Sequence, residues 1–349
     1  MVSLYKIDCY NNPMLKKRLL SGIRPTGSLH IGHYLGVLRN WAKLQNEHEC
    51  FFFIADWHTL TTKYKDTSEL QSDIIEVAKD IVASGIDPNK ATLYVQSAVT
   101  EVAELHLLLS MITYQNWVER DPTLKDMVRL LAEDEEKAKQ EITYGLLGYP
   151  VLMTSDILSV FGEFVPVGKD QVAHLELTRD IARRFNYIYK TDLFPEPKPL
   201  LTETPSVPGI DGRKMSKSLN NDIKLCDSNE DTLKKVKQMI TDPKKIKKTD
   251  PGEPKDCQVA YKHYEIFADK KTLDIVQDEC RGAKIGCVDC KIRLAGIVNN
   301  SLSEIREKRE SLNKDKEILE ILDIGNKRAR QVVKGTLEKV REVMKLKTW

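Results

Sequence analysis

Two short polar segments of this 349-residue chain carry residues that could bind a phosphorylated substrate. In the first, Gly27 permits a tight turn, and His30 and His33 stand three residues apart, so they share one face if the segment opens a helix. Free N–H groups at the start of a helix attract phosphate, and Gly32 would let a flat ring approach the backbone. A His-x-x-His pair on its own is more often structural, so the segment needs support from elsewhere.

The second segment is a glycine-led loop that runs from Gly212 to Asn221. Its two lysines, Lys214 and Lys217, have hydroxyl neighbours such as Ser216. Lysines and hydroxyls together can neutralise the charge of a polyphosphate leaving group. Taken alone, such a segment is equally typical of an ordinary exposed loop.

A third set of candidates lies on a predicted helix over residues 149–158. Tyr149, Met153 and Asp156 stand at positions i, i+4 and i+7, so they line one face of that helix. A thioether suits the face of an apolar ring, and a carboxylate can accept a hydrogen bond from a donor group of a ligand. Without other evidence, such residues are more often core plus a solvent-facing acid.

Four of the seven cysteines fall within 34 residues, with 22, 6 and 2 residues between successive members: Cys257, Cys280, Cys287 and Cys290. In a cytosolic chain, such a group indicates a metal site before it indicates disulfides. Four thiolates can hold either zinc or a [4Fe–4S] cluster. Zinc patterns commonly use two close pairs, whereas here only the last pair is close, and unligated thiols are a third interpretation.

Three apolar runs of strand length, 17–23, 50–55 and 91–95, indicate strands of a parallel sheet that is buried on both faces. Between the second and third runs, residues 68–84 carry apolar side chains at helical spacing. Strand, helix and strand of these lengths are typical of βαβ units. The N-terminal part is therefore predicted to be an α/β domain.

After residue 100 the pattern is mainly helical, and no strand-like run follows Cys226. We expect an α/β domain over 1–222, with a mostly helical insert at about 100–145, and an all-helical domain over 223–349. Residues 234–248 hold seven lysines, which form either a solvated face or a contact to a phosphate backbone.

The composition is that of an ordinary globular chain, with 41% hydrophobic and 30% charged residues and a net charge of +2. It excludes disordered and fibrous proteins, and the total charge does not demand a nucleic-acid partner. No apolar run approaches the roughly 20 residues of a membrane span, and the first residues do not resemble a signal peptide. We expect a cytoplasmic protein without a membrane partner.

The histidine segment (HIGH, residues 30–33) and the lysine loop (KMSKS, residues 214–218), in this order and some 180 residues apart, resemble the two signatures of class I aminoacyl-tRNA synthetases. Other segments resemble the tryptophanyl-tRNA synthetases over nearly the whole chain: 21–27, 55–58, 149–153, 165–171, 174–186 and 211–218. The tyrosyl members carry Gln where this chain has Met153. Lys169 departs from the family, which usually has Glu there.

The resemblance implies a Rossmann-like catalytic domain followed by a helical domain on the anticodon side. It implies that ATP and Mg²⁺ activate L-tryptophan to an adenylate with release of pyrophosphate, and that tryptophan is then transferred to tRNA(Trp). It also implies a homodimer with an interface around residues 100–145. Indole is the largest standard side chain, so no separate editing domain is needed.

The resemblance also implies roles for individual residues. Catalytic roles fall on His30, His33, Lys214, Ser216 and Lys217. The implied ATP-binding residues are Arg24, Pro25, Thr26, Gly32, His33, Gly168, Lys169, Asp170, Val207, Lys214, Met215, Ser216, Lys217 and Ser218. Those implied for tryptophan are Tyr149, Met153, Asp156, Gln171 and His58.

The cysteine spacing is similar to that of a subset of tryptophanyl-tRNA synthetases that carry a [4Fe–4S] cluster in the helical domain, with zinc as the alternative. Rival functions are a tyrosyl enzyme, a small adenylyltransferase that shares the histidine motif, and a synthetase-like RNA-binding protein without catalysis. Met153 argues against the first rival. The KMSKS loop and the cysteine-bearing helical region argue against the second, and the intact histidines and lysines argue against the third.

Overall fold

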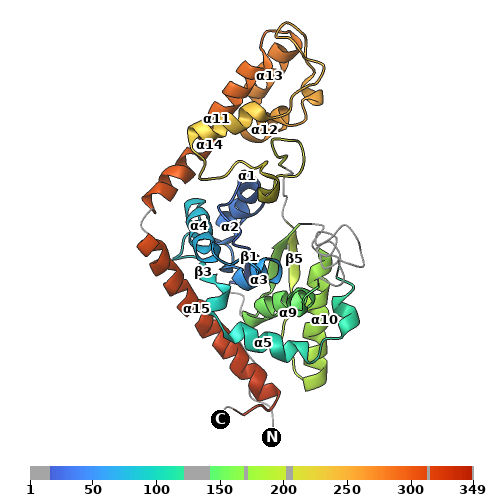
Figure 1. The fold of residues 1–349 in the computed structure, drawn as a ribbon. Helices are drawn as coiled ribbons and strands as arrows, with labels where there is room; N and C mark the ends of the chain where they lie inside the picture. The colour runs from blue at the N-terminus through green and yellow to red at the C-terminus, as the bar shows by residue number, and fades with distance from the viewer. Residues whose placement is uncertain (1–15, 122–141, 169–171, 202–206, 313–314, 348–349) are drawn as a thin grey trace.

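The computed structural model describes residues 16–121, 142–168, 172–201, 207–312 and 315–347. A parallel sheet of order β3-β2-β1-β4-β5 forms the centre of the N-terminal part (Figure 1). Its strands are β1 (Arg18–Ile23), β2 (Glu49–Ile54), β3 (Thr92–Val95), β4 (Phe164–Val167) and β5 (Lys198–Leu201). The sheet confirms the predicted α/β class.

The three strands predicted from apolar runs lie next to one another in the sheet. Leu19 of β1 is paired with Cys50 of β2, and Phe52 of β2 is paired with Leu93 of β3. All four of these side chains are buried, as unbroken apolar strands require.

Two strands, β4 and β5, were not expected, because the sequence after residue 100 reads as mainly helical. Each contains a proline, Pro166 in β4 and Pro199 in β5. Proline lacks the N–H that a sheet ladder uses, so these short segments give a weak strand signal. They nevertheless determine where the strand order reverses, because β4 pairs with β1 on the side opposite β2.

Helices cover the sheet and continue into the insert. They are α1 (Ile31–His33), α2 (Arg39–Leu44), α3 (Asp56–Lys63), α4 (Leu70–Ala83), α5 (Glu101–Ser110), α6 (Gln115–Val118), α9 (Tyr144–Ser159) and α10 (Val172–Tyr189). A π-helical turn (Tyr34–Leu38) joins α1 to α2, and a 3₁₀ turn (Gln96–Ala98) follows β3. The predicted helices at 68–84 and 149–158 are confirmed as α4 and α9.

The described residues after β5 contain helices and loops, as predicted for the C-terminal part. These helices are α11 (Asn229–Gln238), α12 (Ala260–Phe267), α13 (Lys270–Arg281), α14 (Cys287–Ser311) and α15 (Asp315–Val343), with 3₁₀ turns at Lys217–Leu219 and Pro254–Asp256. Helices α11 to α14 form a lobe beyond the sheet, and α15 runs back along the α/β part (Figure 1). In the described part of the chain, none of the helices has the length and apolarity needed to cross a membrane.

Helix α15 docks on β3, the edge strand of the sheet. At Gly325, an added Cβ would lie 1.7 Å from the carbonyl oxygen of Leu93, so only glycine allows this approach. The next residue, Asn326, accepts the N–H of Val95 at 2.9 Å with its side-chain oxygen. The helix therefore covers an edge that would otherwise expose unpaired backbone groups.

The strand order reverses at β1, because β2 continues the sheet on one side and β4 on the other. In open parallel sheets, ligands bind outside the carboxyl ends of the strands at such a switch point. Residues 24–27 follow β1, residues 55–58 follow β2 and Gly168 follows β4. The topology thus directs attention to segments that the sequence had already singled out.

Candidate active site

The segment after β1 and the lysine loop meet, although some 190 residues separate them. Gly27 adopts a φ of +94°, which turns the chain sharply before the histidines. The Lys217 ammonium donates to the carbonyl oxygen of Gly27, and its Nζ lies 3.4 Å from the Thr26 hydroxyl. Arg24, which precedes this turn, donates to Thr62 of α3. The two predicted phosphate-binding segments therefore form one site.

The two histidine rings lie against each other, tilted by 39°, at the start of α1. Their ring centroids are 3.8 Å apart, and Nδ1 of His30 accepts the N–H of Gly32 at 3.1 Å. Burial lowers the pKa of His30 to about 4, although the Asp222 carboxylate opposes the shift. Burial, His30 and the two loop lysines together lower the pKa of His33 to about 3. At neutral pH both rings are therefore neutral, and they can donate a hydrogen bond without carrying charge.

Gly32 is in a more crowded place than the sequence suggested. A Cβ there would come within 2.9 Å of the His30 ring, and the Met215 sulfur lies 3.9 Å from the same point. Glycine is therefore needed to let His30 cap the helix, in addition to leaving the backbone open to a ligand.

The KMSKS loop is braced by a residue whose role the sequence analysis missed. The buried Asn221 accepts the N–H of Ser216 at 2.7 Å and donates to the carbonyl oxygen of Lys214 at 3.2 Å and to Asp211 at 2.7 Å. Within the loop, Met215 is buried while Lys214 and Ser218 are exposed. An asparagine just past a lysine-rich loop gives no local signal of such a role.

The ammonium of Lys217 is less solvated than that of a surface lysine. Burial lowers its pKa to about 8, and the carboxylates of Asp80, Asp73 and Asp222 partly oppose that shift. A cation in this setting interacts strongly with an incoming phosphate, because little water screens it. The loop thus presents one partly desolvated and one exposed lysine beside the turn after β1.

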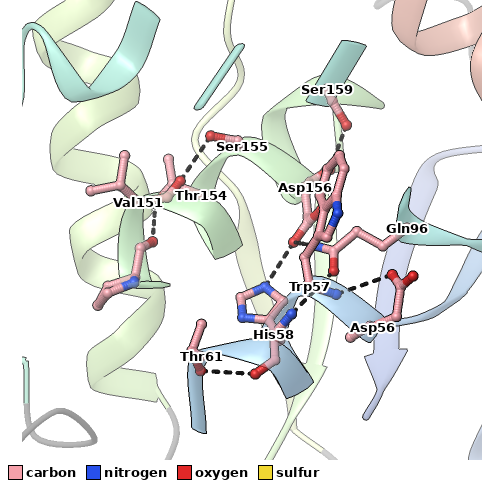
Figure 2. Close-up of polar contacts among 12 residues, drawn as sticks. Asp56, Trp57, His58, Thr61, Gln96, Val151, Thr154, Ser155, Asp156 and Ser159 are labelled. Carbon is pink, nitrogen blue, oxygen red and sulfur yellow. Dashed lines mark hydrogen bonds and ion pairs between the residues drawn. The ribbon is translucent and has the colours of Figure 1, made fainter. Parts of the chain in front are cut away.

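On the predicted face of α9, Asp156 belongs to a buried polar cluster with His58 and Gln96 (Figure 2), while Tyr149 and Met153 are half-buried. The Asp156 carboxylate is fully buried and accepts a hydrogen bond from Nε2 of His58 at 3.0 Å. Burial raises the pKa of Asp156, and the His58 and Gln96 hydrogen bonds oppose this. The Tyr149 ring approaches His58 edge-on, with centroids 6.1 Å apart. Three sequence candidates, from α3 and α9, therefore lie side by side.

Gln96 is the member of this cluster that the sequence analysis missed. Its Nε2 donates to both Asp156 oxygens, at 2.9 and 2.8 Å. It stands directly after β3, and Asp56, directly after β2, accepts the N–H of Ser97 at 3.0 Å. The available signal was a polar residue at the carboxyl end of an apolar run, which is where sheet ligands gather.

The remaining candidates near the sheet are placed as follows. Pro25 and Val207 are buried, Met153 is half-buried against the core, and Gly168 directly follows β4. Lys169, Asp170 and Gln171 lie outside the described residues.

The four clustered cysteines line one cavity in the helical lobe, together with residues such as Lys245 and Tyr264. A Cβ on Gly252 would come within 2.7 Å of the Cys280 sulfur, so the loop that carries this glycine packs directly on the thiols. Across the described ranges, no three His, Cys, Asp or Glu side chains converge closely enough to hold a single metal ion. Four thiols around one cavity are the kind of donor set that holds an iron–sulfur cluster or a zinc ion.

Comparison with known proteins gives a consistent result. The family described as tRNA synthetases class I (W and Y) matches residues 15–303. Tryptophan–tRNA ligases from Aquifex aeolicus and Thermotoga maritima are 44% and 45% identical to this chain; each match covers 94% of it and 100% and 99% of the relative. The structure of tryptophanyl-tRNA synthetase from Campylobacter jejuni with ADP and tryptophan has a TM-score of 0.84 at 34% identity, covering 94% of this chain and 100% of that one.

Proposed function

We infer that this chain, which belongs to the class I tRNA synthetases of the tryptophan and tyrosine family, is a tryptophan–tRNA ligase. It activates L-tryptophan with ATP to tryptophanyl-adenylate and pyrophosphate, and then transfers tryptophan to the 3′ end of its tRNA. The observation that carries this function is the end-to-end similarity to tryptophan–tRNA ligases, at 38–45% identity over nearly the full chain.

This reaction needs no protein nucleophile. The tryptophan carboxylate attacks the α-phosphorus of ATP, and pyrophosphate leaves. What the protein must supply is alignment and positive charge near the leaving phosphates. Lys217 and Lys214, beside the turn after β1, fit that need. A Mg²⁺ ion is expected with ATP, and when bound to the phosphates it would add further positive charge.

For the ATP side we propose a site at the carboxyl ends of β1 and β4. His30 and His33 would donate to phosphate oxygens as neutral rings, and Gly32 would approach the adenosine. Ser216 would act with the two lysines on pyrophosphate. The further residues of this proposed ATP site are Arg24, Pro25, Thr26, Gly168, Lys169, Asp170, Val207, Met215 and Ser218.

For the tryptophan side we propose that Asp156 accepts the indole N–H. Its carboxylate is already held by Gln96 and His58, and a carboxylate has acceptor positions to spare. Met153 would lie against the indole face. Tyr149 and Gln171 would orient the amino group of tryptophan.

The direct test is tryptophan-dependent exchange between ATP and labelled pyrophosphate. The reaction should proceed with tryptophan and fall to background with tyrosine at the same concentration. Exchange that tyrosine supports as well as tryptophan would overturn the specificity. A protein that binds tRNA but gives no exchange with either amino acid would overturn the activity.

We further propose that residues 223–349 bind the anticodon side of tRNA(Trp), with residues 1–222 as the catalytic domain. The lobe of α11 to α14 extends away from the sheet and carries the lysine-rich segment 234–248, which supports a contact to a phosphate backbone. We also propose that the enzyme works in the cytoplasm, where tRNA charging supplies the ribosome.

Our proposal for the helical lobe includes a [4Fe–4S] cluster held by Cys257, Cys280, Cys287 and Cys290. Its support is that all four thiols line one cavity. Four thiolates around one zinc ion would lie only about 3.8 Å apart, given Zn–S bonds near 2.3 Å. When bound, the cluster would cross-link α13, α14 and the loop before α12, so we propose a structural role for it.

Finally, we propose that two copies of the chain pair through the region around residues 100–145. Large apolar side chains are exposed there just after α5 and at the start of α9, including Met111 and Tyr144, which are 70% and 78% exposed. Leu107 and Tyr114 extend the same apolar character. Exposed apolar residues gathered in this way are typical of protein–protein interfaces.

A further inference from the structure

Three segments of the chain hold the loop of residues 26–29, between β1 and α1. Lys217 donates to Gly27 and lies close to the Thr26 hydroxyl. The Asp80 carboxylate of α4 accepts the N–H of Leu29 at 2.6 Å, and the backbone N–H of Leu225 donates to the Leu29 carbonyl oxygen at 2.8 Å. Leu29 immediately precedes His30, so Asp80 is one peptide group away from the histidine motif.

Asp80 in turn depends on a residue from the helical lobe. Its side chain is completely buried, and its second oxygen accepts a hydrogen bond from Nε of Arg309 at 2.7 Å. The same guanidinium donates to Glu76, one turn earlier on α4. Arg309 lies in the last turn of α14, whose first turn carries Cys287 and Cys290.

We propose that Asp80 is a positioning residue for amino-acid activation, and that Arg309 of α14 orients its carboxylate so that the helical lobe supports the phosphate-binding loop. This inference rests on the proposed function and extends it to two residues outside the motifs. The contact of Arg309 with α4 would then affect the first chemical step, the activation of tryptophan.

The physical argument concerns what happens when ATP binds. Lys217 must then turn its charge toward phosphate, which weakens its hold on Gly27 and Thr26. The Asp80 hydrogen bond then holds the N–H of Leu29, while the backbone N–H of Leu225 holds the Leu29 carbonyl oxygen. Burial raises the pKa of Asp80, and the nearby Arg309 charge opposes that rise. Removing Arg309 would leave a buried carboxyl without its cation, free to reorient or take up a proton.

The test uses Arg309→Gln and Asp80→Asn in the full-length protein, assayed by tryptophan-dependent pyrophosphate exchange. We expect kcat to fall at least about tenfold, because misplaced phosphate contacts affect the transition state, while KM for tryptophan stays within about twofold. Arg309→Lys should restore part of the lost rate, because a lysine can reach one carboxylate oxygen.

Lys79→Gln is the matched control. Lys79 is also a buried residue of α4, and it pairs with Asp315 of α15 at 2.8 Å and with Glu76 at 3.2 Å. Among the described residues it makes no direct hydrogen bond to the loop of residues 26–29, and its link to the loop passes through Glu76, which accepts the Ser28 hydroxyl at 3.5 Å. Its variant should lower the melting temperature like Arg309→Gln, yet keep kcat within about twofold of wild type.

A second measurement reports on the loop itself. Amide hydrogen exchange of the peptide that contains Leu29 should be faster in Arg309→Gln than in Lys79→Gln. Equal kcat values and equal exchange in these two variants would overturn the inference, because the effect would then be general destabilisation. Wild-type protein without tryptophan-dependent exchange would instead overturn the proposed function, and the amide exchange would still report on Asp80.

Discussion

Replacing Asp156 by asparagine is the sharpest test of how tryptophan is recognised. The carboxylate is fully buried and accepts from Gln96 at 2.9 and 2.8 Å and from His58 at 3.0 Å. Asparagine keeps the shape and one acceptor oxygen, but it presents an NH₂ group where the second oxygen stood. The indole N–H would then meet either a weaker neutral acceptor or another donor.

The expected loss follows from the strength of this interaction. A hydrogen bond to a charged acceptor contributes about 1.5–3 kcal/mol. At about 1.4 kcal/mol for each factor of ten, kcat/KM for tryptophan should fall roughly ten- to hundredfold in Asp156→Asn. The Gln96 and His58 side chains can still bond the asparagine, so the fold should persist.

The assay is pyrophosphate exchange with tryptophan and with an analogue in which a ring sulfur replaces the indole N–H. Wild-type enzyme should prefer tryptophan, and Asp156→Asn should lose most of that preference, because the analogue never used the hydrogen bond. Ser155→Ala is the control: this neighbour on α9 is equally buried but bonds only the Val151 carbonyl. An Asp156→Asn enzyme with wild-type kcat/KM and undiminished preference would refute the assignment.

Three further predictions follow from other parts of the structure. Burial lowers the pKa of Lys217 to about 8, so its ammonium is present below that pH and lost above it. The value of kcat/KM for ATP should therefore fall as pH rises through about 8, and Lys217→Arg should shift this fall to higher pH. Protein purified without oxygen should be brown, with about four iron and four sulfide per chain. The Cys287→Ser variant should lose the iron and the sulfide, whereas Cys226→Ser, whose thiol lies outside the cysteine cavity, should keep them. Colourless protein with one zinc per chain would contradict the cluster. Gly325→Ala should lower the melting temperature and cost about 1–3 kcal/mol of stability, because the new Cβ meets a backbone carbonyl. Gly335→Ala, on the same helix, should stabilise the protein by about 1 kcal/mol, because an added Cβ there has no atom within 4 Å. Equal effects of the two variants would argue against the docking of α15.

Local sequence patterns determined much of this protein. The apolar runs that became β1, β2 and β3, and the periodic stripe that became α4, were readable because burial on both faces or on one face imposes a spacing on the side chains. The i, i+4, i+7 spacing likewise places Tyr149, Met153 and Asp156 on one face of α9, because helix geometry alone brings these positions together. The motifs before α1 and in the lysine loop carried their chemistry in their residue types.

The tertiary structure decided what lies beside these elements. Gln96 bonds Asp156 across 60 residues, and Arg309 bonds Asp80 across 229 residues. The partners are so far apart in the sequence that no local spacing predicts either contact. Burial, which sequence does not measure, makes His30 and His33 neutral and lowers the pKa of Lys217.

The same reason explains the unexpected strands and the cysteine cavity. β4 and β5 contain prolines and are strands because the sheet accepts them as partners, not because of their own propensity. The 22-6-2 spacing singled out four cysteines, but only the packing of α13, α14 and the preceding loops brings their thiols around one cavity. Periodicity is a local property that the chain encodes directly, whereas contacts between distant residues exist only once the helices and strands have packed.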